Sequence, residues 1–166
     1  RFFLSSVNNV GLNEKFDYYI FEKNCKWISN DMEERIKYVY TINFSRSTLC
    51  NPNMTEDIIN IIEKYGIAYS CIAIEILEDK DLSASERSTM INNLRLLKAK
   101  GILILLDDFG KGYTSFDDLS GFDISIVKID KSITQNATSQ AGFLILKNII
   151  QIAHDLGFKT LCEGIE

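Results

Sequence analysis

The feature of the sequence that most constrains its fold is a regular alternation of helical patterns with short, apolar, β-rich runs. Residues 12–28 repeat apolar side chains at three- to four-residue multiples, and the β-rich run 38–42 follows them. Further strand-like runs, each after another helical pattern, occur at residues 71–74, 102–106, 124–127 and 158–162. This alternation predicts parallel strands joined by right-handed crossovers, and therefore a doubly wound sheet or a (β/α)8 barrel.

The helical patterns also predict where one helix starts and which face each helix buries. Ser83 and Glu86 have the spacing of a capping box, at the start of a helix that Gly101 closes. The side chains expected to face the core are Leu12, Phe16, Ile20 and Trp27 in the first helix, Ile58, Ile61, Ile62 and Tyr65 in the second, Met90, Leu94 and Leu97 in the third, and Phe143, Leu146, Ile150 and Ala153 in the last.

Composition limits the class of protein. With 46% hydrophobic and 25% charged residues, residues 1–166 are expected to form a single globular domain. No apolar run approaches the roughly 20 residues that a membrane span requires, so we expect a soluble, cytoplasmic chain. The four cysteines are scattered and are expected to be reduced thiols. A net charge of −5 argues against binding a nucleic-acid polymer through its phosphates, so an anionic ligand would need metal ions.

Polar side chains end every predicted strand. They are Asn43, Glu75, Asp107 with Asp108, Lys128 with Asp130, and Glu163. The carboxyl ends of parallel strands meet at one rim, so these side chains are expected to face a common pocket. Oxygen ligands without paired histidines suit Mg²⁺, Mn²⁺ or Ca²⁺, and shared carboxylates are typical of two-metal phosphodiester hydrolysis. For any one of these residues, a solvated strand end or a helix N-cap is an equally good interpretation.

Two further features bear on the site. Asp107 and Asp108 are adjacent carboxylates after an apolar strand, and they repel each other unless a cation lies between them. The glycines of residues 109–113 are typical of a loop over a site, although a plain connection is also possible.

His154, the only histidine, falls on the last predicted helix and away from the rim, so we expect no catalytic role for it.

Five ordered motifs resemble those of one family, the EAL domains. The segment Asp107-Asp108-Phe109-Gly110-x-Gly112-Tyr113-x-Ser115 is similar to the family signature DDFG-x-G-Y-[ST]-S. The other motifs are Ile42-Asn43-Phe44-Ser45 for V-N-L-S, Ile74-Glu75-Ile76-Leu77-Glu78 for L-E-I-T-E, Val127-Lys128-Ile129-Asp130 for L-K-I-D, and Glu163-Gly164-Ile165-Glu166 for E-G-V-E. The resemblance spans nearly all 166 residues.

The resemblance implies a fold and an activity. It implies a (β/α)8 TIM-type barrel with one antiparallel strand, which hydrolyses one phosphodiester of cyclic di-GMP to give linear pGpG, supported by Mg²⁺ or Mn²⁺, as two ions, and inhibited by Ca²⁺. It is also compatible with a homodimer or other homo-oligomer and, in the parent protein, with a fused sensor or GGDEF domain. The implied metal ligands are Asn43, Glu75, Asp107, Asp108 and Glu163, the implied catalytic residues are Lys128, Glu163 and Asp107, and Glu78 is implied to stabilise the loop from Asp108 to Ser115.

Departures from the family pattern leave alternatives open. The Glu-Ala-Leu triplet is expected before Arg1 and a family glutamine after Glu166, so we expect an incomplete barrel without its first strand or strands and last βα unit. Such a fragment is expected either to form a homo-oligomer that covers its open edges or to pack irregularly there, and to be inactive by itself. Ser5 and Asn8 replace the usual proline and glutamate. The alternatives are a non-catalytic module that binds cyclic di-GMP or a protein partner, and another metallohydrolase.

Overall fold

Five parallel strands form a single sheet in the order of the sequence. The computed structural model describes residues 12–77, 81–110, 119 and 121–165. The strands are β1 (Tyr40–Phe44), β2 (Ile72–Ile76), β3 (Leu103–Phe109), β4 (Ile126–Ile129) and β5 (Lys159–Cys162), and each pairs in parallel with the next. A doubly wound sheet reverses its strand order at a switch point, whereas a (β/α)8 barrel does not. The sequential order therefore identifies an incomplete TIM-type barrel, as the motifs predict.

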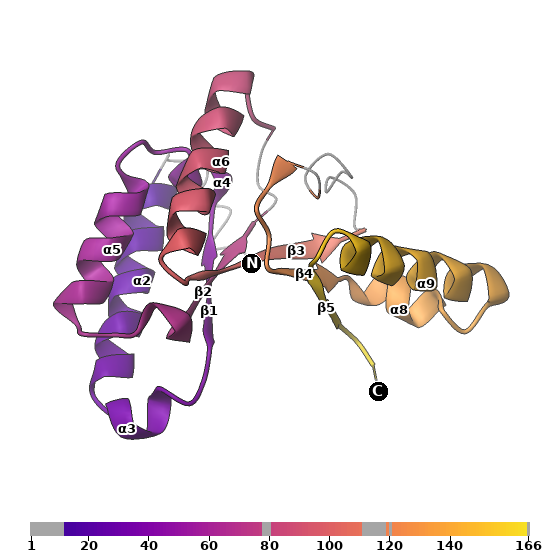
Figure 1. Ribbon diagram of the computed structural model, residues 1–166, viewed down its shortest axis with the longest axis horizontal. Helices are drawn as coiled ribbons and strands as arrows, with labels where there is room; N and C mark the ends of the chain where they lie inside the picture. Colours follow the sequence, from indigo (N-terminus) through magenta and orange to yellow (C-terminus); the bar gives the residue numbers. More distant parts are fainter. Residues whose placement is uncertain (1–11, 78–80, 111–118, 120, 166) are drawn as a thin grey trace.

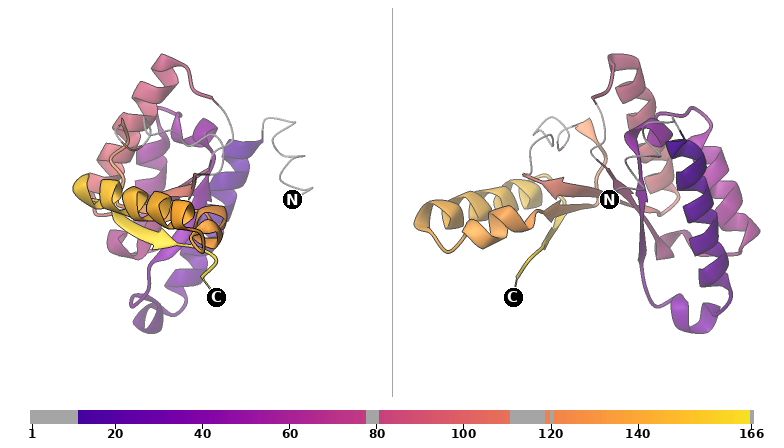
Figure 2. Two further views of the ribbon diagram at one scale, coloured as in Figure 1. Left: turned by 90° about the vertical axis from the view of Figure 1, so that its right-hand side faces the viewer. Right: turned by 180° about the vertical axis from the view of Figure 1, so that it is seen from behind.

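Helices connect the strands and cover one face of the sheet. They are α2 (Asn13–Ser29), α3 (Met32–Arg35), α4 (Arg46–Leu49), α5 (Met54–Lys64), α6 (Ala84–Ala99), α8 (Lys131–Asn136) and α9 (Gln140–Asp155), with the 3₁₀ turn η1 (Tyr69–Cys71) before β2. Figure 1 shows α2, α5 and α6 packed together beside β1 and β2, whereas α8 and α9 lie together on the side of β4 and β5. The view from behind in Figure 2 shows the same two groups of helices.

The core lies between the sheet and these helices. Ile42 and Phe44 of β1 are buried, and all of β2 is buried. The helices contribute Phe21, Ile58, Ile62, Met90 and Leu94, each with no exposed surface. Successive side chains of a strand point to opposite faces. Asn43, which alternates with Ile42 and Phe44, therefore faces away from the helices, toward what is the interior in a closed barrel.

The start of α6 matches the capping prediction. Ser83 is the N-cap residue, its side chain accepts a hydrogen bond from the backbone N–H of Glu86, and the Glu86 carboxylate accepts one from the backbone N–H of Ser83. This reciprocal arrangement satisfies two amide groups that a helix end leaves without partners. Met90, Leu94 and Leu97 are buried, as predicted for this helix.

The predicted buried face of α2 was wrong. Leu12 and Trp27 are 44% and 50% exposed, and the buried residues of the helix are Asp17, Phe21, Cys25 and Ile28. Trp27 lies at the surface, where the Arg35 guanidinium stacks over its ring, with 3.7 Å to the centroid. Asp17 is buried because its carboxylate accepts hydrogen bonds from the β1–α4 connection, which no local pattern reveals.

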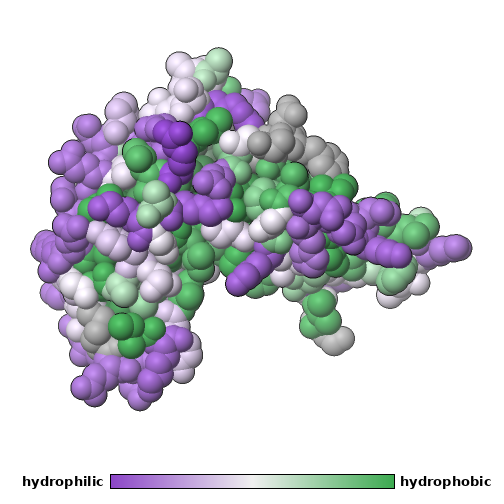
Figure 3. Space-filling model, viewed as in Figure 1, coloured by the Kyte–Doolittle hydropathy of each residue, from purple (hydrophilic) through white to green (hydrophobic). Residues whose placement is uncertain are grey.

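The buried face of α9 was predicted correctly at Ala153, which is 1% exposed, but wrongly at Phe143, which is 56% exposed. Gly142 occupies the inward position of the first turn instead. A Cβ at Gly142 would lie 1.9 Å from the carbonyl oxygen of Asn136, so only glycine allows this approach. The hydrophobic atoms visible toward the right-hand end of Figure 3 belong to this half of the molecule, where Leu144 and Ile145 are also exposed.

Strand positions differ from the predicted runs by a few residues. Tyr38 and Val39 precede β1 and are 60% and 50% exposed. As a result Asn43, Glu75, Asp107 and Lys128 lie inside the carboxyl ends of their strands rather than after them. None of the helices in the described parts of the chain is long and apolar enough to cross a membrane.

Candidate metal centre

Lys128, on β4, lies at the centre of a group of three carboxylates, two on other strands and one just after β5. Its ammonium donates to the carboxylates of Glu75, of Asp107 at 2.7 Å and of Glu163 at 2.9 Å. Glu75 is on β2 and Asp107 on β3, while Glu163 directly follows β5. The Lys128 side chain is only 16% exposed, so these ion pairs are largely shielded from water. The structure thus brings together four of the residues that the sequence predicts to face a common site.

The surroundings shift the pKa values of three of these groups. Burial opposes the charge of Lys128, but hydrogen bonds to Asp107, Glu75 and Glu163 outweigh it and hold the pKa of the ammonium above its usual range. Burial raises the pKa of Glu75, against the hydrogen bond from Lys128. Burial acts in the same direction on Asp107, but the hydrogen bond from Lys128 and others outweigh it and leave the pKa of Asp107 lowered. Asp107 is thus the more readily ionised of the two carboxyl groups.

An irregularity in β3 places two adjacent carboxylates in the site. Leu106 pairs with Val127 and Phe109 pairs with Ile129, so Asp107 and Asp108 together oppose the single residue Lys128. Two residues that oppose one form a β-bulge, which interrupts the alternation of side chains between faces. Asp108 adopts the left-handed φ of 50°, a conformation that aspartate tolerates better than most residues. The bulge allows the Asp108 carboxylate to point toward β4 and β5.

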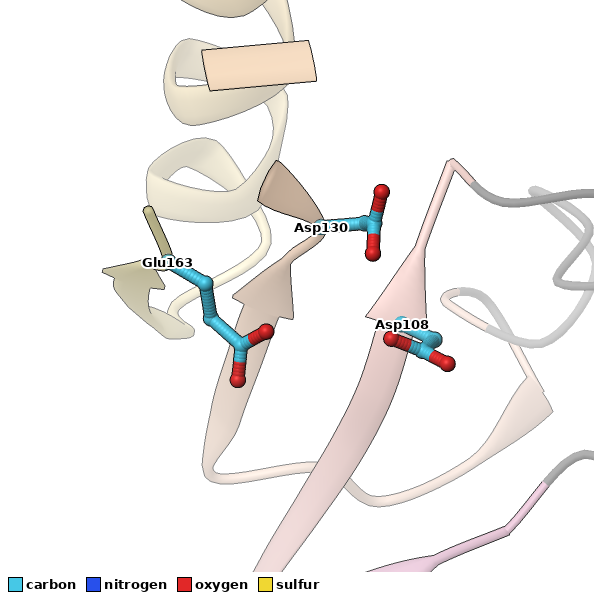
Figure 4. Close-up of side chains that lie close together, drawn as sticks. All are labelled: Asp108, Asp130 and Glu163. Carbon is cyan, nitrogen blue, oxygen red and sulfur yellow. The ribbon is translucent and has the colours of Figure 1, made fainter. Parts of the chain in front are cut away.

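A second group of carboxylates adjoins the first. Figure 4 shows the side chains of Asp108, Asp130 and Glu163 pointing into one space between the ends of β3, β4 and β5. One carboxylate oxygen from each residue lies within 4.8 Å of the others. Glu163 belongs to both groups, because it also contacts Lys128. The two groups therefore form one continuous acidic centre.

Asp130 is a residue of this centre that the sequence places among the side chains facing the common pocket, but that the family resemblance does not assign to a metal. Its carboxylate accepts a hydrogen bond from the backbone N–H of Ser132 at 2.8 Å and so caps the N-terminus of α8. It is 3% exposed. The available signal was its position two residues after Lys128, since residues two apart on a strand lie on the same side.

Other predicted residues lie beside the centre or outside the described residues. Asn43 pairs with Glu75 in the register of β1 and β2, so it lies on the strand next to the Lys128 group, with its side chain exposed. Glu78 and the loop residues 111–118 are outside the described residues. His154 is exposed on α9, where its Nε2 lies 3.3 Å from Thr160 Oγ1.

The donor set fits a hard divalent cation. The centre contains five carboxylates, those of Glu75, Asp107, Asp108, Asp130 and Glu163, of which three pair with the Lys128 ammonium, so it carries excess negative charge. Their ligand atoms are all oxygens, which Mg²⁺, Mn²⁺ and Ca²⁺ prefer, and no histidine or cysteine is among them. The arrangement can therefore bind divalent cations beside a protonated lysine.

Comparisons with known proteins define the class to which this fold and centre belong. A family model described as EAL domain matches residues 1–166, and the chain belongs to this family. The probable cyclic di-GMP phosphodiesterase PdeA of Escherichia coli (strain K12) is 26% identical over 165 residues, 99% of this chain and 22% of that protein. The cyclic di-GMP phosphodiesterase PdeB of Shewanella oneidensis is 27% identical over 165 residues, 99% of this chain and 19% of that protein. The chain thus spans about a fifth of the length of these curated relatives.

Solved structures agree with the family assignment. The crystal structure of an EAL domain protein from Listeria monocytogenes EGD-e has a TM-score of 0.82 and 27% identity, and the match covers 99% of this chain and 64% of that chain. The EAL domain of Xanthomonas citri FimX, in complex with c-diGMP, has a TM-score of 0.81 and 19% identity, over 96% of this chain and 63% of that chain. The second likeness supports the fold alone. The predictions of the family and of a TIM-type barrel are confirmed.

Proposed function

We propose that this chain is part of a metal-dependent phosphodiesterase that hydrolyses cyclic di-GMP to linear pGpG. The observation that carries the proposal is the Lys128 ammonium held among the carboxylates of Glu75, Asp107 and Glu163, next to the carboxylates of Asp108 and Asp130. Membership of the EAL domain family and the names of the curated relatives support the same substrate. The negative net charge also favours recognition of an anionic ligand through cations.

The acidic centre is proposed to bind two divalent cations, Mg²⁺ or Mn²⁺, with Ca²⁺ as an inhibitor. The proposed ligands are Asn43, Glu75, Asp107, Asp108 and Glu163, and the geometry adds Asp130 as a candidate. When bound, such cations would polarise the phosphate oxygens and lower the pKa of a water molecule. The bulge at Asp107 and Asp108 would let one short segment serve both ions, because the two carboxylates reach different parts of the centre.

Lys128, Asp107 and Glu163 are proposed to act directly in the reaction. The oxygen of water attacks phosphorus, the bond between phosphorus and O3′ breaks, and O3′ takes up a proton to become a hydroxyl group. Lys128 would orient the attacking water or assist its deprotonation, because its ammonium is held in place by the carboxylates of Glu75, Asp107 and Glu163. Asp107 and Glu163, which fix it, would also hold the cations that offset the charge developing at the phosphate.

The wider context of the protein is also a proposal. From the family resemblance we expect a homodimer or other homo-oligomer and a role for Glu78 in stabilising the loop from Asp108 to Ser115, and the full-length protein could carry a fused sensor or GGDEF domain. Cyclic di-GMP is the expected partner of the acidic centre, and the names of the curated relatives, which are cyclic di-GMP phosphodiesterases, support this expectation.

The test compares two substrates and two variants of the full-length protein. We expect the wild type with Mn²⁺ to convert cyclic di-GMP to pGpG and to act far more slowly on bis(p-nitrophenyl) phosphate. Asp107→Asn is expected to lower turnover by about 10²-fold or more, since a ligand and a lysine partner are both impaired. Asp123→Asn is the control, because Asp123 is exposed and pairs with Lys98 far from the centre.

Each alternative has its own outcome. Tight binding of cyclic di-GMP without pGpG would favour a binding module. Equal turnover of both phosphodiesters would favour a general metallohydrolase. Full activity in folded Asp107→Asn would contradict the proposed site.

A further inference from the structure

The short helix α8 contacts the backbone of Glu163. The hydroxyl of Thr134, in the middle of α8, donates a hydrogen bond to the carbonyl oxygen of Glu163. Gly164, the next residue, has a φ of 69°, and a Cβ there would lie 2.7 Å from the Cβ of Lys131. The chain after β5 therefore lies directly against α8.

The same helix packs against the segment that follows the bulge. Ile133 is next to Thr134, and its Cδ1 would lie 2.0 Å from a Cβ placed on Gly110. Gly110 follows Phe109 directly and is two residues after Asp108. Adjacent residues of one helix thus touch the segments that carry Asp108 and Glu163, whose carboxylates lie close together in Figure 4.

Glu163 depends on two contacts for its backbone position. Its N–H donates to the carbonyl oxygen of Ile129 on β4 at 3.1 Å, and its carbonyl accepts from Thr134. The first contact extends the ladder between β4 and β5. Among the hydrogen bonds of the described residues, the second is the only one between a side chain and the main chain of Glu163. A shift of the main chain at Glu163 would move its carboxylate relative to Lys128 and Asp108, because the side chain is attached to the Cα that lies between these two bonds.

We infer that Thr134 is a positioning residue that fixes the Glu163 carboxylate for cation binding. The inference rests on the proposed function, because it assumes that Glu163 is a metal ligand. Groups that hold a ligand in place, without touching the metal, contribute to metal affinity because they reduce the freedom that the ligand loses on binding. Thr134 acts through the main chain of Glu163 and makes no contact with the reacting atoms.

The test measures Mn²⁺ affinity in full-length protein from which metal has been removed, by calorimetry and by the electron paramagnetic resonance of free Mn²⁺. Thr134→Val keeps the shape of the side chain and removes the hydroxyl donor. It is expected to weaken Mn²⁺ binding by about tenfold, the low end for residues that support a ligand. Thr134→Ser keeps the hydroxyl and is expected to bind Mn²⁺ within about twofold of the wild type.

A threonine close to α8 provides a matched control. Thr138 donates to the carbonyl oxygen of Gln135 at 3.4 Å, as Thr134 does to that of Lys131 at 3.0 Å. Of these two threonine hydroxyls, however, only that of Thr134 also bonds to the carbonyl oxygen of Glu163. Thr138→Val is expected to leave Mn²⁺ affinity unchanged. Unchanged affinity in Thr134→Val, or equal losses in Thr134→Val and Thr138→Val, would overturn the inference.

Failure of the inference can be told apart from failure of the proposed function. If the wild type binds Mn²⁺ but forms no pGpG, the proposed reaction fails while the comparison of Thr134 variants still decides the positioning role. If the wild type forms pGpG and Thr134→Val binds Mn²⁺ normally, only the positioning role is lost. Thermal unfolding without metal shows whether Thr134→Val is folded, and a lower melting temperature with normal Mn²⁺ affinity would assign Thr134 a structural role only.

Discussion

The Lys128 ammonium lies 2.7 Å from the Asp107 carboxylate across the neighbouring strands β4 and β3. The contact forms where β3 is bulged, so that Asp107 and Asp108 both oppose Lys128. One cation of the protein thereby offsets part of the repulsion between carboxylates that are proposed to bind metal. The stability of the strand ends and the binding of cations are consequently linked through Lys128.

Removing the lysine should lower stability and activity for related reasons. Lys128→Met leaves Glu75, Asp107 and Glu163 without their shared cation, so we expect a loss of about 2 kcal/mol in the free energy of unfolding without metal. Saturating Mn²⁺ should recover much of this loss, because it offsets the same repulsion. Turnover should fall by about 10²-fold or more even at saturating substrate. Urea unfolding with and without Mn²⁺ and steady-state kinetics measure both effects.

Lys131→Met is the matched control for this variant. Lys131 is exposed at the start of α8 and carries the same charge, so its loss should change neither quantity appreciably. Equal effects of the two substitutions, or a Lys128→Met protein as stable as the wild type in EDTA, would contradict the account of Lys128.

The glycine after the bulged strand should not tolerate a side chain. Gly110 has a φ of 100° and lies against Ile133, whereas Gly66 has a φ of 64° and no atom within 4 Å of the position that a Cβ would take. Gly66→Ala should cost about 1 kcal/mol from backbone strain alone. Gly110→Ala should cost about 1–3 kcal/mol more, because the methyl group also collides with Ile133. Melting temperatures of the two variants give the comparison, and similar losses would show that α8 does not pack tightly on Gly110.

The buried carboxylate of Asp17 should stabilise the connection that follows Asn43. It accepts hydrogen bonds from the Ser45 backbone N–H at 3.0 Å, the Ser45 hydroxyl at 2.7 Å and the Thr48 hydroxyl at 2.6 Å. Asp17→Ala leaves these buried donors without an acceptor and is expected to cost about 2–3 kcal/mol. Glu14→Ala, which removes only an exposed contact to Asn51, should cost under about 0.5 kcal/mol. Comparable losses in chemical denaturation would disprove a special role for Asp17.

Burial should keep Cys25 unreactive until the protein unfolds. Cys25 has no exposed surface, and burial, with a smaller effect of Glu22, raises the pKa of its thiol to about 12. Because the folded pKa lies above the ordinary value, this group contributes stability below pH 9 and loses it as the pH rises toward 12. At neutral pH its contribution is therefore constant. Iodoacetamide labelling followed by mass spectrometry should modify Cys50 and Cys162, which are partly exposed, well before Cys25.

Much of the fold could be predicted because local patterns and global topology agree. The capping box at Ser83 and the stripe Met90, Leu94 and Leu97 describe α6 as it is found. The phase of α2 could not be predicted, because the burial of Asp17 depends on donors at Ser45 and Thr48, distant in sequence. Phe143 was assigned to the core from its helical spacing with Leu146, Ile150 and Ala153, although the close approach of Gly142 to Asn136 turns it outward.

The residues of the site could be predicted from the sequence, but the bulge that sets the positions of Asp107 and Asp108 could not. Parallel strands bring their carboxyl ends together, so Glu75, Asp107, Lys128 and Glu163 were expected to meet. The left-handed φ of Asp108 has no sequence signal beyond the tolerance of aspartate for it. Without the bulge, strand alternation places Asp107 and Asp108 on opposite faces. The bulge, which the sequence does not predict, is therefore what brings Asp108 close to Asp130 and Glu163.

Product analysis tests the central claim most directly. The full-length protein is incubated with cyclic di-GMP and either Mn²⁺ or EDTA, and the nucleotides are separated by chromatography and identified by mass. The account predicts pGpG with Mn²⁺, none with EDTA, and recovery when Mn²⁺ is restored in excess. Conversion that persists in EDTA, or no conversion by folded protein shown to bind Mn²⁺, would contradict it.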